Sequence, residues 1–306
     1  MPRPSPKEVQ RSPKPTSPSE VVHPIWLVRA VALTMLAALI CGYLTLCLLF
    51  YQGQWQFALH PSRNPVTQPI GEVIHFAPDE SAVPQLTGQW IPAAPGARYA
   101  QNTILFLPSG YGNLADSTSL LNTLHNLGIN VFAFDYRGYG LSANIHPNQQ
   151  RMLQDAESAW QYLTTSRTIP ARQIIPYGIG VGASLATNIA ATHPEVPALI
   201  LESPHADLLN AALSDPRSRF LPIRLLFHER FPLAEPLATL RTPKLLIISS
   251  NRTDKSSSAF HTAADPKLAV EFPSPNEALF TQTLNRFLDQ YLQLVPSPAP
   301  SSTMPH

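Results

Sequence analysis

The stretch from Ile174 to Ala186 constrains the fold of this chain most, because it joins two different patterns. It begins as a continuous apolar run and ends as an amphipathic one, with Gly178, Gly180 and Gly182 at alternate positions between them. This pattern is typical of a strand that breaks sharply into a helix. So tight a turn accepts only small residues beside its apex, because a Cβ atom there would strike the neighbouring strand or helix. The sequence therefore predicts a strand–turn–helix unit with a glycine at the apex.

A second constraint lies near the N-terminus, where residues 30–51 form a run of 22 without a charge. At ~1.5 Å per residue, a helix of that length spans a hydrocarbon core of ~30 Å. The run is too long and too uniformly apolar for a buried core helix. A cleaved signal peptide would have a shorter apolar region and a small-residue cleavage site. We therefore expect residues 25–51 to form an uncleaved transmembrane helix, a signal-anchor, after a disordered proline-rich segment at 1–24.

The charges around this run predict its orientation. Positive residues precede it, including Arg29 at its edge, and none follows until Arg63. The positive-inside rule then puts the N-terminus in the cytoplasm and the globular part outside it, in the periplasm if the source is bacterial. Cys41 and Cys47 both lie inside the run, so the globular part has no disulfide or thiolate chemistry. The balance of 21 basic against 20 acidic residues gives no field for nucleic acid.

Buried strands and helices alternate along the rest of the chain. Apolar runs typical of strands buried on both faces occur at 103–107, 130–134, 174–179, 198–201 and 244–248. Helical periodicity occurs at 117–127, 151–163, 182–192 and 277–292. This alternation predicts an α/β fold, a mostly parallel central sheet with helices on both faces. Residues 204–236, with five prolines, are expected to form a small lid region, and residues 294–306 a disordered tail.

Further motifs resemble those of the α/β-hydrolases. Residues 135–142 read Asp-Tyr-Arg-Gly-Tyr-Gly-Leu-Ser, which is similar to the DYRGYGxS turn of that superfamily. Residues 86–90 resemble its strand with closely spaced Leu, Gly and Trp, and residues 201–204 resemble its ESP motif. Residues 107–113 stand where the family has HGNAGN. From 57 to 293 the chain thus resembles membrane-anchored serine hydrolases of the prolyl-aminopeptidase-like and monoacylglycerol-lipase-like branch, which implies an α/β-hydrolase fold.

The resemblance implies that the tight turn is a nucleophile elbow, Y-G-x-S-x-G-G in the family. Residues 177–183 align with that pattern without a gap and place Gly180 at the nucleophile position, where glycine offers no attacking group. Ser184 offers a rival frame, G-x-S-x-A. That frame would push three glycines into a strand and shift the helix by four residues, ~6 Å. We expect Ser184 to be a small helix residue packed on the sheet; a relocated nucleophile is the alternative.

The other members of the implied triad are also altered. Asp254 matches the position of the catalytic acid, with a solvated turn residue as the alternative. The family's histidine follows the last strand, and Pro275 stands at or near that position. His261 comes too early and His205 follows the ESP motif, so both are expected to be structural or surface residues.

The implied oxyanion hole would use the backbone N–H groups of Tyr111 and Val181, which need no particular side chain. The helix that begins near Val181 would present its positive end to an anion. Histidines and acids show no spacing typical of a metal site, and the alternate glycines suit the hydrolase turn better than a dinucleotide fingerprint. We therefore expect no metal and no cofactor.

Two hypotheses of function follow. The favoured one is a membrane-anchored, α/β-hydrolase-like pseudoenzyme that binds a small-molecule or protein ligand. Loss of the nucleophile or the histidine each costs ~10⁶ in kcat in a triad enzyme, and an oxyanion hole alone gives only ~10³ over water. The alternative is a serine hydrolase, an esterase, lipase or peptidase, with a relocated nucleophile such as Ser184 or Ser109.

Overall fold

The computed structural model describes residues 24–57, 59–64, 69–78, 83–204, 208–214, 216–249, 260–272 and 277–292. It divides into two compact units, residues 1–49 and 50–306. The first unit holds most of helix α1 (Pro24–Gly53), which has no buried residue. The candidate span Pro24–Gln56 has a mean hydropathy of 2.3, so α1 is long and apolar enough to cross a membrane.

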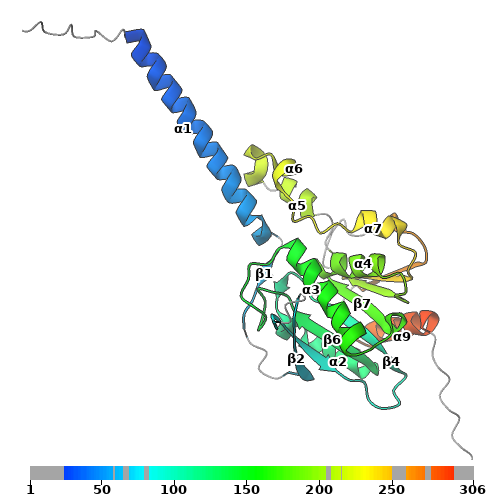
Figure 1. Cartoon of the computed structure of the whole chain (residues 1–306). Helices are drawn as coiled ribbons and strands as arrows, with labels where there is room; N and C mark the ends of the chain where they lie inside the picture. The colour runs from blue at the N-terminus through cyan, green and yellow to red at the C-terminus, as the bar shows by residue number, and fades with distance from the viewer. Residues whose placement is uncertain are drawn as a thin grey trace, which may run out of the picture. The chain divides into compact units, whose positions relative to one another are not determined.

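The second unit is built on an eight-stranded sheet with the order β10-β9-β8-β7-β4-β6-β3-β2 (Figure 1). The strands are β2 (Glu72–Phe76), β3 (Leu86–Ile91), β4 (Tyr99–Leu107), β6 (Ile129–Asp135), β7 (Ile174–Ile179), β8 (Leu199–Glu202), β9 (Lys244–Ser249) and β10 (Lys267–Phe272). Strand β3 runs antiparallel to β2 and β6, and all other pairs are parallel. The predicted mostly parallel α/β sheet is therefore confirmed.

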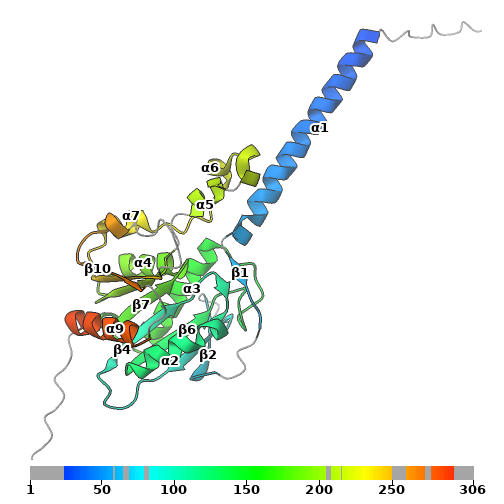
Figure 2. The same cartoon turned by 180° about the vertical axis from the view of Figure 1, so that it is seen from behind.

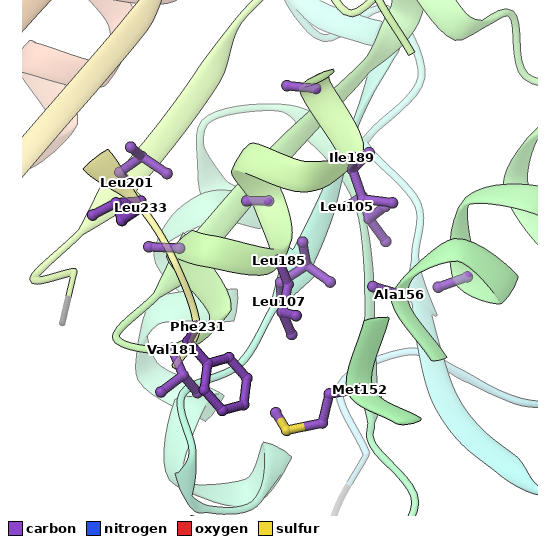
Figure 3. Close-up of a cluster of buried hydrophobic side chains, with 14 of the residues drawn as sticks. Leu105, Leu107, Met152, Ala156, Val181, Leu185, Ile189, Leu201, Phe231 and Leu233 are labelled. Carbon is purple, nitrogen blue, oxygen red and sulfur yellow. The ribbon is translucent and has the colours of Figure 1, made fainter. Parts of the chain in front are cut away.

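Helices cover both faces of this sheet, as the two opposite views show (Figures 1 and 2). Helices α3 (Gln149–Gln161) and α4 (Gly182–Thr192) pack on one face, and α2 (Thr118–Asn126) and α9 (Glu277–Tyr291) on the other. On the α3–α4 face, Leu185 and Ile189 of α4 meet Leu105 and Leu107 of β4 (Figure 3). Each fully buried leucine or isoleucine contributes ~1.5–3 kcal/mol. This packing fixes α4, and with it the turn that precedes it.

Short elements complete the unit. Strands β1 (His60–Pro61) and β5 (Tyr111–Gly112) form a separate two-stranded parallel sheet. Between β8 and β9 lie α5 (Leu208–Ser214), the 3₁₀ helix η5 (Pro216–Phe220), α6 (Ile223–Leu226) and α7 (Ala234–Thr239). We call residues 208–239 the cap segment; it overlaps residues 204–236, whose role as a small lid stays a prediction. The remaining short turns are η1 (Gln54–Phe57), η2 (Leu114–Ser117), η3 (Tyr162–Ser166) and η4 (Ala171–Gln173).

Candidate functional site

The site is built at the carboxyl edge of the sheet, where β7 turns into α4. Strand β7 ends at Ile179 and α4 begins at Gly182. Gly180 between them has φ +57°, in the left-handed region, and its N–H donates to Glu202 O at 3.1 Å. A side chain in that region costs roughly 1–2 kcal/mol, so glycine is the least strained residue at this apex.

The flanking glycines are required by close backbone approach. A Cβ atom on Gly178 would lie 2.2 Å from Gly182 O. A Cβ atom on Gly182 would lie 2.2 Å from Leu107 O and 2.5 Å from Pro108 O. These obstacles are backbone atoms of neighbouring elements, which cannot move as a side chain can. The geometry therefore suits an elbow whose apex is Gly180 and whose two flanking positions admit no side chain.

Ser184 lies in the first turns of α4, beyond that apex. The residue is 8% exposed, and its Oγ donates to Pro232 O of the cap segment at 2.7 Å. A buried hydroxyl that donates its proton to a carbonyl has no base to activate it. The geometry thus favours the packed helix residue over the relocated nucleophile.

Ser109 lies in the loop after β4, which continues into β5. Its Oγ donates to Tyr111 O at 3.1 Å and accepts from the Tyr111 N–H at 3.3 Å. The hydroxyl therefore shapes its own loop. It also accepts the hydrogen bond of the Tyr111 N–H, which is one of the two groups expected to bind an oxyanion.

The Val181 N–H is the other group expected to bind an oxyanion. Val181 is 1% exposed and stands at the N-cap of α4. Within the described residues its N–H has no hydrogen-bond partner. The loop after β4 lies beside it, since a Cβ atom added to Gly182 would meet the carbonyls of Leu107 and Pro108. The start of α4 therefore offers a buried N–H to an oxygen atom at this edge of the sheet.

Residues between α1 and β2 bind the backbone of the loop after β4. The sequence did not predict these contacts. His60 N donates to Gly110 O at 2.6 Å, and Ser62 N donates to Gly112 O at 2.9 Å. The His60 ring stacks on the Tyr111 ring, with centroids 4.7 Å apart and planes at 6°. Two-residue strands leave no periodic pattern, so the only sequence signal was the turn-rich composition of the loop.

The DYRGYG turn holds the same loop from the other side. Tyr136 donates its hydroxyl to Pro108 O at 3.2 Å, and Tyr139 donates to Gly110 O at 3.1 Å. Burial raises the pKa of both tyrosines, so they stay protonated donors. The family motif therefore acts here as a clamp on the loop backbone.

Two buried carboxyl groups stabilise this turn. Asp135 Oδ1 accepts the Leu114 N–H at 2.8 Å, and burial raises the pKa of Asp135 to about 6 although backbone N–H groups oppose the shift. Asp155 accepts the Arg137 Nε at 2.6 Å and the Arg137 N–H at 2.9 Å. Burial likewise raises the pKa of Asp155 to about 6 against the pull of Arg137.

A third carboxyl lies next to the elbow. Glu202 ends β8, and its Oε2 accepts the Tyr177 hydroxyl at 2.5 Å. Burial raises the pKa of both groups. Glu202 belongs to the motif that resembles ESP, to which the sequence assigned no role, and here it joins β7 to β8 directly below Gly180.

Of the four remaining residues singled out in the sequence, the structure describes only His261. Asp254, Pro275 and His205 lie outside the described residues, so their roles stay predictions. His261 is exposed, and its carbonyl accepts Lys267 Nζ at 2.8 Å. Among the described residues no group of three or more metal-ligating side chains comes together.

Comparison with known proteins decides the family. Residues 100–289 match the model of the serine aminopeptidase S33 family. The chain belongs to this family, and its fold is the α/β-hydrolase fold.

Relatives of this chain differ in how much of it they cover. An uncharacterised protein of Mycobacterium tuberculosis is 27% identical over 255 residues, 80% of this chain and 87% of that protein. The human alpha/beta hydrolase domain-containing protein 17C is 30% identical over 162 residues, 52% of this chain and 45% of that protein. A solved esterase from Pyrococcus furiosus has a TM-score of 0.58 at 16% identity, over 76% of this chain and 97% of its own, which is a likeness of fold.

Proposed function

We propose that this chain is a membrane-anchored member of its family that binds a ligand at the elbow and does not hydrolyse it. The observation that supports this most is Gly180 at the apex of the turn, at φ +57° between two glycines that admit no side chain. The elbow frame leaves the nucleophile position without a reactive atom. Ser184, the nearest serine of the rival frame, donates its hydroxyl to Pro232 O.

The remaining features of the site suit an oxygen-bearing ligand. The Val181 N–H has no partner among the described residues and stands at the start of an 11-residue helix. Such a group binds a carbonyl or carboxylate oxygen. We therefore infer a ligand with an acyl or carboxylate group.

We further propose that α1 anchors this domain in a membrane, with the N-terminus in the cytoplasm and residues from 52 onward outside it. The apolar span and the charge asymmetry around it support both points. A reporter enzyme active only outside the cytoplasm, fused after His306, should be active in a bacterial host. An inactive fusion beside an active cytoplasmic reporter would contradict the orientation.

The catalytic proposal is tested with the full chain in detergent micelles, a fluorophosphonate probe and p-nitrophenyl esters. We expect neither labelling nor turnover by the wild type. Gly180→Ser alone lacks a base, and Pro275→His alone lacks a nucleophile, so each should stay inactive. The double variant should gain labelling and weak ester hydrolysis if Asp254 faces the site, a strongly non-additive effect.

The serine-hydrolase alternative makes the opposite prediction for the wild type. Stoichiometric labelling that is lost in Ser184→Ala or in Ser109→Ala, and kept in Gly180→Ala, would overturn the proposal. It would also identify the relocated nucleophile. Gly180→Ala is the matched control, because it changes the apex without adding a reactive group.

A further inference from the structure

The cap segment exposes large apolar side chains. Phe220, at the end of η5, is 77% exposed, and Leu225 in α6 is 83% exposed. No other large apolar side chain in the described part of the chain is as exposed, including those of α1. Exposed apolar groups of this kind mark a surface that contacts another phase or another molecule.

The same stretch is strongly basic. Residues 216–230 contain four of the chain's sixteen arginines, and Arg219, Arg224 and Arg230 are exposed. The one acid in this stretch, Glu229, is 4% exposed and accepts the Gln149 N–H at 2.6 Å. The outer side of the stretch therefore carries positive charge and apolar groups without a compensating carboxylate.

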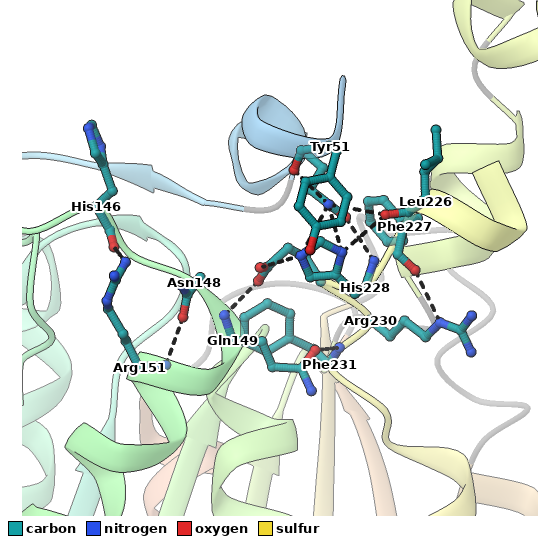
Figure 4. A network of polar contacts seen from close by, with 12 residues as sticks. Tyr51, His146, Asn148, Gln149, Arg151, Leu226, Phe227, His228, Arg230 and Phe231 are labelled. Atoms are coloured by element: carbon teal, nitrogen blue, oxygen red, sulfur yellow. Dashed lines mark hydrogen bonds and ion pairs between the residues drawn. The ribbon is translucent and has the colours of Figure 1, made fainter. Parts of the chain in front are cut away.

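Hydrogen bonds join this stretch to Gln54, the first residue of η1 (Figure 4). Gln54, 1% exposed, donates from Nε2 to Leu226 O at 3.2 Å and accepts the His228 N–H at 2.8 Å. The Tyr51 ring lies 4.6 Å from the His228 ring. Within the second unit, residues 226–228 are thus held against Tyr51 and Gln54.

We propose that residues 216–230 form a second membrane contact, in which Phe220 and Leu225 enter the bilayer surface and the arginines meet anionic lipid headgroups. The inference rests on the proposed membrane anchor, because Tyr51 and Gln54 mark where α1 leaves the bilayer. Apolar side chains interleaved with arginines are the composition of interfacial segments. Each basic residue near an anionic surface adds about a fivefold preference for it. The contact would fix the position of the cap segment relative to the bilayer. That segment includes Pro232, whose carbonyl accepts the Ser184 hydroxyl of α4.

The test measures the depth of single nitroxide labels on the full chain in nanodiscs that contain anionic lipid. Cys41 and Cys47 are first replaced by serine, so that each label is unique. Labels at Phe220→Cys and Leu225→Cys should collide with oxygen, which concentrates in the bilayer, more than with a water-soluble nickel chelate. Both side chains are exposed, so these changes should not affect folding.

Two reference positions make the outcome decisive. A label at Leu39→Cys in α1 should be in lipid, and one at Val73→Cys, a 43% exposed position on the edge strand β2, should be in water. The second contact would be overturned, and the anchor left intact, by two results together. The label at position 39 would be in lipid, and the labels at 220 and 225 would be as accessible to the nickel chelate as the label at 73. Water contact at 39 would overturn the anchor and this inference together.

The arginines are tested separately. Arg219→Glu with Arg224→Glu should withdraw the label at 220 from anionic bilayers, by about fivefold in contact for each arginine removed. Arg172→Glu, an exposed arginine of η4, should leave that label unchanged. Equal effects of both changes, or labels at 220 and 225 shielded from oxygen and nickel alike by a second protein surface, would contradict a lipid contact.

Discussion

Alanine substitutions at the elbow test the whole account of the site. At Gly182 the new Cβ would lie 2.2 Å from Leu107 O, well inside the 3.4–4 Å of an ordinary van der Waals contact. Leu107 is fully buried at the end of β4, and β4 is hydrogen-bonded between β6 and β7, so its carbonyl cannot retreat without disturbing the ladder. Overpacking of this kind costs ~1–3 kcal/mol, and an obstacle that is rigid backbone places Gly182→Ala at or above ~3 kcal/mol.

At Gly180 the cost has a different origin. The backbone at φ +57° is the left-handed region, where alanine costs roughly 1–2 kcal/mol. Gly180→Ser should cost about the same, below ~2 kcal/mol. Urea denaturation of the full chain in micelles, followed by the fluorescence of the packed residues Trp90 and Trp160, measures both. With a slope of ~2 kcal/mol per molar urea, the midpoint should fall by ~1.5 M for Gly182→Ala and by ~0.5–1 M for Gly180→Ala.

The test depends on which variant, Gly182→Ala or Gly180→Ala, loses more stability. Equal losses, or a larger loss at Gly180, would mean that the apex of the turn lies elsewhere. Gly96, which has open space around its Cβ position and φ +76°, is the matched control for backbone strain alone. Gly96→Ala should resemble Gly180→Ala and not Gly182→Ala.

Two further predictions concern the turn and loop around the elbow. Burial raises the pKa of Asp135 to about 6, above its unfolded value, so its contribution of ~2–3 kcal/mol is present below pH ~4 and lost as the pH rises through ~6. Denaturation at several pH values should show this fall in stability, and a profile unchanged by Asp135→Asn would refute the assignment. His60→Ala removes the ring stacked on Tyr111 and should cost ~0.5–1.5 kcal/mol, whereas His60→Phe should retain most of it.

The parts of the fold that the sequence predicted are those that local patterns determine. The helix expected at 182–192 is α4 with the same bounds, because alternate glycines and then a steady apolar face define both of its ends. Strand β4 begins at Tyr99, four residues before the predicted strand at 103–107. Gln101 and Asn102 interrupt the apolar run there, and the pairing with β6 shifts register between Tyr99 and Thr103. The α3 helix begins at Gln149 and not at 151, because the Asn148 side chain caps it by accepting the Arg151 N–H.

The candidate site was predictable only where it follows the chain locally. Gly180 could be placed at the apex because the two flanking glycines, Gly178 and Gly182, are each only two residues away. The bonds of Gln54 to the cap segment and of His60 to the loop after β4 could not be predicted, since single polar contacts across long separations leave no periodic signal. Asp254 and Pro275 remain predictions from alignment alone.

The pairing of β1 with β5 also bears on the order in which the chain can assemble. His60 and Pro61 follow η1 and are synthesised before most of the second unit, yet their partners are Tyr111 and Gly112. The partner of Gln54 is synthesised later still, because His228 lies 174 residues downstream. Contacts across such separations close late, because the loop entropy must be overcome before they form. The contact of Gln54 with residues 226–228 should therefore be among the last to form, although Gln54 is among the first residues of the second unit to be synthesised.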